Sequence, residues 1–269
     1  MRFTKLRFNG LEVVDFPIIG ATPQDVYICK GVDGLGPSEI ELSIANTLNA
    51  GGYYQGRRAQ NKQIVSLIGL NPDHSTGQTP SDLRESLYGL LSPGHGEDYI
   101  TVQLVDTSTV VAEMLGYVSK MEINPFSADP EVQITTDCLK AYFQAPNDLF
   151  VSPASKITPE IENVGTAPAG FHLEVLFTAG ITDWTLTHTA GRKMEINYEF
   201  LAGDLLTIDT RPGYRGIWVT RASVTTNIIY ALSSDSVWHM LHGGINAFST
   251  SSSAFDWGDV FYLPQFWGI

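Results

Sequence analysis

The chain has 269 residues, of which 43% are hydrophobic, so it is long enough to bury one large core or two ordinary ones. Only 17% of its residues are charged, while it holds 25 glycines and 14 prolines, a composition typical of a β-rich globular protein. The formal net charge of −13 disfavours stable binding to nucleic acids and to anionic membrane surfaces, because both repel an acidic protein.

The N-terminal stretch and the cysteines carry no targeting or disulfide pattern. No apolar segment follows the basic start MRFTKLRFNG, so we expect no signal peptide. A membrane-spanning helix needs a run of about eighteen apolar residues. The sequence has no run of that length, so no membrane insertion is expected. Cys29 and Cys138 lie far apart in the sequence and form no CxxC pair, and they are predicted to be buried free thiols.

One helix is predicted near 80–91. Thr79 would be its N-cap, Pro80 its first helical residue, and Asp82 stands at the capping-box position three residues after the cap. The turn-forming residues 92–94 (SPG) are expected to end it. Four leucines at i, i+4, i+7 and i+8 would form its apolar face: Leu83, Leu87, Leu90 and Leu91.

Most of the remaining chain is predicted to form short strands, because apolar and polar residues alternate with a period of two. Such alternation places one face of each strand in a core. The clearest alternations lie at 100–104, 132–136, 173–177 and 194–200.

A domain boundary is predicted within the proline-rich stretch 144–165, which separates strand-like segments. The N-terminal domain is therefore assigned to 1–154 and the C-terminal domain to 155–269. The aromatic end FDWGDVFYLPQFWGI (255–269) could be a docked last strand or an exposed interaction strip. We favour a docked strand whose final residues touch a neighbour.

The stretch LAGDLLTIDTRPGYRGIWV (201–219) raises the question of acid–base chemistry. Asp204 and Asp209 are five positions apart, so in a strand their side chains would point to opposite faces. A glycosidase needs two carboxylates on facing elements, and this spacing argues against such a pair. We interpret both as turn residues that hold the ends of a strand, with Leu206 and Ile208 facing the core.

His239 and His242 are three positions apart, so on a helix they would share one face and could bind a metal. A short helical turn is predicted nearby, at 234–241. No acidic or cysteine partner stands at a recognisable spacing, so a packed turn is favoured over a metal site. The sequence also lacks a GxSxG elbow, a Walker A motif and a GxGxxG after a strand. We therefore predict no catalytic, cofactor-binding or metal-binding residues and no enzyme activity.

The second half holds an ordered series of strand, hairpin and turn segments. Its opening strand and Asn-x-Gly-Thr turn lie in PEIENVGTAPAGFHLEVLFTAG (159–180). Its hairpin and Gly-Asp-x-Leu-x-Ile-Asp-Thr strand lie in ITDWTLTHTAGRKMEINYEFLAGDLLTIDT (181–210). A Ser-x-Trp-x-x-Leu-x-x-Gly-x-Asn segment follows in SSDSVWHMLHGGINAFS (233–249), and YLPQFWGI closes the series. In their order and spacing, these segments resemble the C-terminal domain of siphophage distal tail proteins.

The first half is similar to the family's N-terminal domain over GGYYQGRRAQNKQIVSLIGL (51–70) and over the helix at 80–91. Members of the family usually carry a basic residue just before the strand that follows a loop. Either Lys62 or Arg58 fills that place in this chain.

The resemblance implies a mainly β protein with an N-terminal β-barrel-like sheet domain, which carries one helix, and a C-terminal galectin-like β-sandwich. It implies a structural virion protein at the distal end of a long non-contractile phage tail, made in the host cytoplasm. Copies of the chain would form a homohexamer ring that joins the tail tube to the tail tip or baseplate. The implied partners are further copies of the chain, the tail-tube protein, and the tail-tip hub and tape-measure proteins.

A carbohydrate-binding module for host surface glycans is the alternative, based on the expected sandwich and the five tryptophans. Trp184, Trp218 and Trp238 lie in strand or turn patterns that would bury them, which disfavours a sugar platform. The chain is also too short to hold the sugar-binding insertion of many family members. A galectin-like strand layout does not by itself imply lectin activity.

Overall fold

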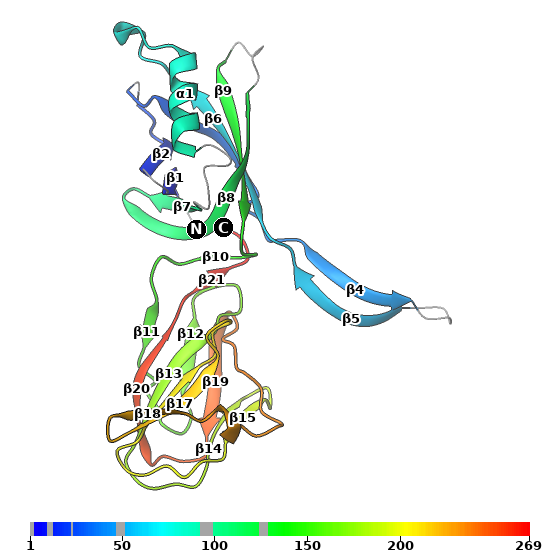
Figure 1. Ribbon diagram of the computed structural model, residues 1–269, viewed down its shortest axis with the longest axis vertical. Helices are drawn as coiled ribbons and strands as arrows, with labels where there is room; N and C mark the ends of the chain where they lie inside the picture. The colour runs from blue at the N-terminus through cyan, green and yellow to red at the C-terminus, as the bar shows by residue number, and fades with distance from the viewer. Residues whose placement is uncertain (1–2, 10–12, 23, 47–51, 92–98, 124–128) are drawn as a thin grey trace. The chain divides into compact units, whose positions relative to one another are not determined.

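The computed structural model describes residues 3–9, 13–22, 24–46, 52–91, 99–123 and 129–269 (Figure 1). The chain divides into two compact units. The first unit comprises Met1–Pro146 together with Trp267–Ile269, and the second comprises Asn147–Phe266. Both are built mainly from antiparallel strands, which confirms the predicted mainly β fold.

The first unit is built on one antiparallel sheet in the order β2-β1-β7-β8-β9-β6-β3. The short strand β10 pairs with β8 beside this path. The strands are β1 (Lys5–Asn9), β2 (Val13–Pro17), β3 (Tyr27–Asp33), β6 (Gln63–Leu70), β7 (Ile100–Asp106), β8 (Thr109–Ile123), β9 (Glu131–Cys138) and β10 (Phe143–Gln144).

This sheet curves so that its two end strands approach each other, as expected of a barrel-like sheet. The rings of Phe16 on β2 and Tyr27 on β3 meet edge to face, with their centroids 6.0 Å apart. Phe8 on β1 packs against Phe16 at 5.3 Å, inside the curve. Over the described strands the sheet stays open, because β2 and β3 are the ends of the hydrogen-bonded path.

The predicted helix is α1 (Pro80–Leu91), and Figure 1 shows it beside the strands of the first unit. Its capping box is confirmed: the Thr79 N–H donates to the Asp82 carboxylate at 2.8 Å, and the Asp82 N–H donates to Thr79 Oγ1 at 3.3 Å. The Tyr27 hydroxyl donates to the Leu83 carbonyl at 3.0 Å, which ties the helix to β3. The predicted stop at 92–94 lies outside the described residues. The leucines that α1 buries are Leu83, Leu87 and Leu91.

A separate two-stranded sheet lies between β3 and β6 in the sequence. It consists of β4 (Ile40–Asn46) and β5 (Gly52–Ala59), paired antiparallel with Ile40 opposite Ala59. A short 3₁₀ turn, η1 (His74–Thr76), precedes α1.

The second unit is a β-sandwich of a six-stranded and a four-stranded antiparallel sheet. The larger sheet has the order β11-β20-β13-β16-β17-β18 and the smaller one β12-β19-β14-β15. The larger sheet comprises β11 (Leu149–Val151), β13 (Phe171–Phe177), β16 (Leu205–Asp209), β17 (Gly216–Arg221), β18 (Val224–Asn227) and β20 (Phe255–Tyr262). The smaller sheet and the remaining elements are β12 (Glu160–Asn163), β14 (Trp184–His188), β15 (Lys193–Ile196), β19 (Gly244–Thr250), η2 (Ile229–Ala231) and β21 (Gln265–Phe266).

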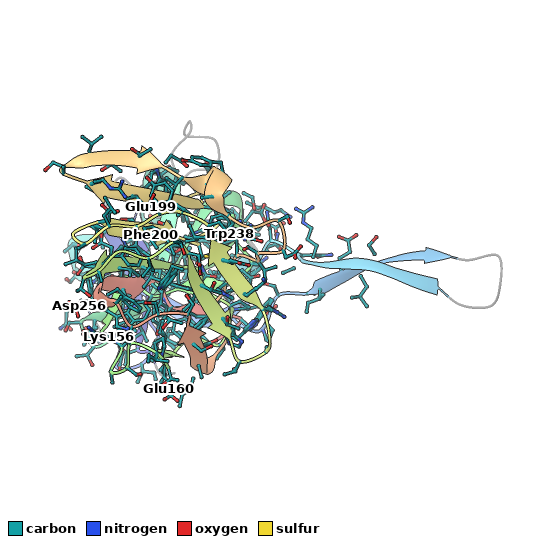
Figure 2. All side chains as sticks on the ribbon, turned by 90° about the horizontal axis from the view of Figure 1, so that it is seen from below. Lys156, Glu160, Glu199, Phe200, Trp238 and Asp256 are labelled. Atoms are coloured by element: carbon teal, nitrogen blue, oxygen red, sulfur yellow. The ribbon has the colours of Figure 1, made fainter. Side chains whose placement is uncertain are left out.

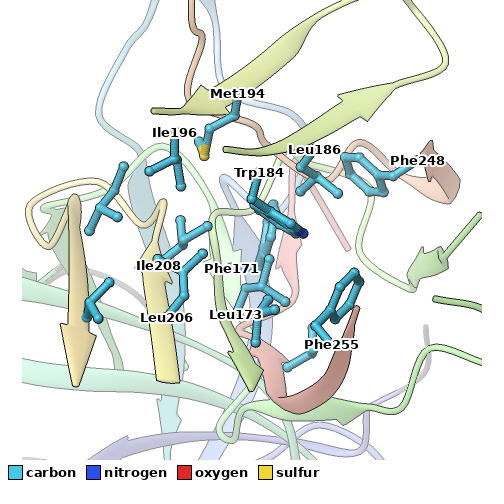
Figure 3. Close-up of a cluster of buried hydrophobic side chains, with 14 of the residues drawn as sticks. Phe171, Leu173, Trp184, Leu186, Met194, Ile196, Leu206, Ile208, Phe248 and Phe255 are labelled. Atoms are coloured by element: carbon cyan, nitrogen blue, oxygen red, sulfur yellow. The ribbon is translucent and has the colours of Figure 1, made fainter. Parts of the chain in front are cut away.

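The core of the second unit fills the space between the two sheets (Figure 3). Trp184 and Leu186 of β14 meet Leu206 and Ile208 of β16 and Phe255 of β20, and all five side chains are buried. Burial of large apolar side chains is the main favourable term in folding, so this cluster determines the stability of the sandwich.

The strands predicted at 100–104, 132–136 and 173–177 are confirmed as parts of β7, β9 and β13. The strand predicted over 194–200 ends earlier, at Ile196. There the backbone changes partner, because the Asn197 N–H donates to the carbonyl of Ala231 at 2.8 Å. Phe200 is nevertheless buried, so the predicted core position at 200 is correct although the strand has already ended.

The helical turn predicted at 234–241 is wrong. Only a turn at 234–235 forms, and 236–240 carry no helix. The Val237 N–H donates to the carbonyl of Lys193 at 2.9 Å and the Leu241 N–H to that of Ala169 at 2.8 Å. Bonds to neighbouring segments thus replace the i to i−4 bonds that a helix would need.

Candidate functional site

The two aspartates of the 201–219 stretch each close a turn at one end of β16. Asp204 is 1% exposed, and its carboxylate accepts the Leu201 N–H at 2.8 Å. Arg221 of β17 adds two hydrogen bonds to the same carboxylate, at 2.8 and 2.6 Å. These bonds from Arg221 hold the pKa of Asp204 below its ordinary value. Gly203, with φ of +90°, makes the turn before Asp204.

Asp209 closes the other end of β16. Its carboxylate accepts the Arg211 backbone N–H at 2.9 Å and the Arg211 guanidinium at 2.6 to 3.1 Å. Paired in this way, the Asp209 side chain is 7% exposed. Two buried carboxylates therefore bind turn amides at opposite ends of one strand, as predicted, and each also binds an arginine, which was not predicted. Leu206 and Ile208 between them face the core.

A surface patch surrounds Asp209 on the outer face of the larger sheet. We call Phe150, His172, Arg211, Tyr214 and Phe261 the aromatic patch. The His172 ring stacks on Phe261 at 4.5 Å between centroids. The Arg211 guanidinium carbon lies 5.2 Å from the ring centroid of Phe261 and 5.4 Å from that of Tyr214.

Two rings of the aromatic patch face solvent: Phe150 is 74% exposed and Tyr214 is 69% exposed. Two carboxylates stand beside His172 in the same patch: its Nε2 lies 3.5 Å from Glu174 and its Nδ1 lies 3.8 Å from Asp209. Sequence reasoning missed the patch. Its members come from segments that only the pairing of β11, β20, β13 and β16 brings together.

The two histidines suggested as metal ligands lie in different environments. His239 is 3% exposed, and its Nε2 lies 3.0 Å from the carbonyl of Leu186. Burial lowers the pKa of His239. His242 is exposed. Within the described ranges no group of three or more His, Cys, Asp or Glu side chains could hold a metal ion.

The five tryptophans all lie in described segments, and none of them is classed as exposed. Trp184 is fully buried in the core. Trp238 is partly covered by Arg215, whose guanidinium carbon lies 5.9 Å from the Trp238 ring centroid. Trp238 is labelled in Figure 2. The same view labels Lys156 and Asp256, which form a surface ion pair at 2.5 Å. A flat tryptophan platform for sugars is not formed.

Of the two basic residues proposed for one family position, Lys62 directly precedes β6, whereas Arg58 lies within β5. Lys62 is 5% exposed and Arg58 is exposed. Cys29 and Cys138 are buried free thiols, as predicted. Burial raises the pKa of Cys29 to about 11 and that of Cys138 to about 12. No helix in the part of the chain that the structure covers is long and apolar enough to cross a membrane.

Residues 164–265 match the family model of the siphovirus-type tail component, C-terminal domain. Among solved structures, the chain is similar to SPP1 Dit (gp 19.1), described as a paradigm of the hub adsorption apparatus in phages that infect Gram-positive bacteria. The identity is 14%, the TM-score is 0.63, and the match covers 97% of this chain and 99% of that chain. A chain of the phage P2 baseplate in its activated conformation with Ca also matches, at 8% identity and a TM-score of 0.39 over 97% of both chains.

No curated protein sequence matches the chain. The second unit thus has a sequence match, and nearly the whole chain has a fold match. The predicted resemblance to the siphophage distal tail protein family is confirmed.

Proposed function

We propose that the chain is a structural subunit of a long non-contractile phage tail, whose copies form a ring that joins the tail tube to the tail tip. The observation that carries this proposal is the family match over 164–265, which covers most of the second unit. The fold likeness to SPP1 Dit extends over both units and supports the same role for the whole chain. The protein would then act at the distal end of the tail in the virion.

A non-enzymatic role fits the chemistry of the two buried aspartates. A catalytic carboxylate must be free to exchange a proton or to contact a substrate. Asp204 and Asp209 are instead bound by Arg221 and Arg211 and by turn amides. We infer that both serve the structure of the sandwich. We also propose that the strands of the sandwich have a galectin-like layout.

The β4–β5 hairpin is the segment that we propose to contact a second copy. A two-stranded sheet is only marginally stable by itself in water. Ile40 and Leu42 lie two residues apart on β4, so they share one face, and they are 48% and 56% exposed. Packing that face against another copy would bury both side chains. A homohexamer is the expected ring, with the tail-tube protein and the tip hub or tape-measure proteins as its neighbours.

Mass photometry and negative-stain imaging of the purified chain over a range of concentrations test the ring. We expect closed rings of several copies, and Ile40→Asp with Leu42→Asp should shift them to monomers. Val224→Asp is the matched control, because Val224 is 65% exposed in the second unit. Monomers at every concentration, both alone and with purified tail-tube protein, would contradict the proposal.

A second candidate function, binding of host surface glycans, is favoured by one observation only. The aromatic patch holds the exposed rings of Phe150 and Tyr214 together with His172, which lies beside the carboxylates of Asp209 and Glu174. Exposed rings and carboxylates in one patch can hold a sugar ring and its hydroxyls. A glycan array probed with the full chain tests it. Binding that is lost in Phe150→Ala with Tyr214→Ala but kept in Tyr230→Ala would support it, since Tyr230 is 76% exposed. If no glycan on the array binds the chain, glycan binding is contradicted and the structural role remains the one candidate.

A further inference from the structure

Lys62 is a buried cation that is held by backbone carbonyls. It is 5% exposed, although lysine is almost never fully buried unless it is paired. Its Nζ donates to the carbonyl of Gly36 and, at 3.3 Å, to the carbonyl of Trp267. It also lies 5.2 Å from the ring centroid of Phe143. One ammonium group therefore joins two segments that are more than two hundred residues apart in the sequence.

The last three residues of the chain also contact the loop 34–39, which contains Gly36, and these contacts do not involve Lys62. The Ile269 N–H donates to the carbonyl of Leu35 at 2.9 Å. Gly268 lies so close to this loop that a Cβ there would be 2.8 Å from the Gly36 carbonyl carbon and from the Pro37 nitrogen. The Trp267 ring meets Tyr142 edge to face at 4.7 Å between centroids.

The loop that these contacts hold, 34–39, is the base of the β4–β5 hairpin. It connects β3 to β4, and its opposite side is 60–62, which connects β5 to β6. The Gln60 N–H donates to the carbonyl of Glu39 at 2.9 Å across this base. The Ser38 hydroxyl donates to the carbonyl of Ala141 at 2.6 Å, which ties the loop to the body of the first unit.

We propose that residues 267–269 form a clasp that fixes the base of the β4–β5 hairpin, with Lys62 as the positioning residue that fastens it. Without the clasp, the loop 34–39 loses its contacts to Ile269 and Gly268, and Lys62 keeps its bond to Gly36 but loses its bond to the Trp267 carbonyl. The hairpin base then opens more often, because fewer of the described contacts hold it: the bonds from Lys62 to Gly36 and from Ser38 to Ala141, and the pairing of its own strands. The consequence for ring formation rests on the proposed function, whereas the clasp itself does not.

Hydrogen–deuterium exchange of the full chain tests the clasp by following the amides of 38–43 in the monomer. We expect about tenfold faster exchange there when 267–269 are deleted, and a similar increase in Lys62→Met. Lys62→Arg keeps the cation and should change it less. The matched control is Lys140→Met, because Lys140 is exposed and donates only to the Gln144 side chain at 2.8 Å. Amides of β13 in the second unit serve as the internal reference.

The double variant decides whether Lys62 acts through the clasp. If it does, Lys62→Met speeds exchange at 38–43 less in the deletion variant than in the full chain, because the bond to the Trp267 carbonyl is already gone and only the bond to Gly36 remains to be lost. Independent, multiplying effects would show that Lys62 supports the loop separately and would overturn its role as the fastening residue. Unchanged exchange after the deletion would overturn the clasp.

Should Lys62→Met unfold the first unit, Trp267→Ala provides the second test, because it removes the ring that meets Tyr142 and keeps the backbone carbonyl that Lys62 binds. Faster exchange confined to the hairpin base supports the clasp, and wild-type exchange contradicts it. Mass photometry on the same samples tests the ring separately. Rings that fail to form in the wild-type chain, with the clasp intact by exchange, count against the proposed function alone.

Discussion

The two units hold their buried charges in different ways. In the second unit, Asp209 is paired with Arg211 two residues away, and Asp204 with Arg221 on the neighbouring strand β17. In the first unit, Lys62 is held by carbonyls of Gly36 and Trp267. Charge pairs within one hairpin form as soon as that hairpin forms. A lysine satisfied by distant backbone depends on the whole unit being folded, so we expect the first unit to tolerate local damage less well.

The largest expected effect lies in the sandwich core of the second unit. Trp184→Ala should lower the free energy of unfolding by about 3–5 kcal/mol, because Trp184 is fully buried and its removal leaves a cavity. Denaturant unfolding of the full chain measures it. Tyr230→Ala, at a site 76% exposed in the same unit, should change the free energy by about 0.5 kcal/mol or less. Equal losses for the two variants would show that burial does not determine the stability of this unit.

A pair of glycines sharpens the comparison between the units. Gly34 and Gly191 have φ of +85° and +79°. An alanine Cβ at Gly34 would lie 1.9 Å from the carbonyl oxygen of Gln63, whereas nothing lies within 4 Å at Gly191. Gly191→Ala should cost about 1–2 kcal/mol for the left-handed backbone alone. Gly34→Ala should cost clearly more, since a backbone atom must also move, and thermal unfolding of both variants compares them.

Asp204 should make the second unit sensitive to acid. Its pKa is lowered in the folded state, so its stabilisation is complete above the unfolded value of about 3.9 and is lost as the pH falls through the folded value. Asp204→Asn should cost about 1–3 kcal/mol at pH 7. The lower half of that range is expected, because the Arg221 side chain is 42% exposed and screened by solvent.

Urea unfolding of Asp204→Asn and of the wild type at pH 7 and pH 3 tests this acid sensitivity. The difference between the two proteins should shrink at pH 3. A difference that stays constant would refute the ionic part of the explanation. Asp183→Asn, at an exposed position, is the control and should have little effect at either pH.

The smallest effect is expected for the two thiols. Burial raises the pKa of Cys29 to about 11 and that of Cys138 to about 12, so neither is a thiolate near pH 8. Neither thiol should react with a colorimetric thiol reagent in the folded chain at pH 8, and both should react in denaturant. Rapid reaction of either cysteine in the native chain would reveal opening of the first unit.

Local patterns predicted those elements whose structure depends on neighbours in the sequence. The capping box at Thr79 and Asp82 needs residues three apart, and the turns at Asp204 and Asp209 need only their own loops and flanking strands. The turn predicted at 234–241 failed because its amides bond to Lys193 and Ala169, which the local sequence cannot reveal. The strand over 194–200 ended early, at Ile196, for the same reason, because the Asn197 amide bonds to Ala231.

The sequence by itself determined the mainly β class, α1 with its cap, the turn roles of Asp204 and Asp209, and the ordered motifs of the family. Only the tertiary structure decided how distant segments meet. It brought Phe150, His172 and Phe261 together on one face of the sandwich. It also placed the last three residues against the loop at 34–38, with Lys62 between them. Local hydrogen bonding and burial periodicity are encoded within a few residues, whereas strand pairing and the burial of Lys62 depend on contacts that no short window contains.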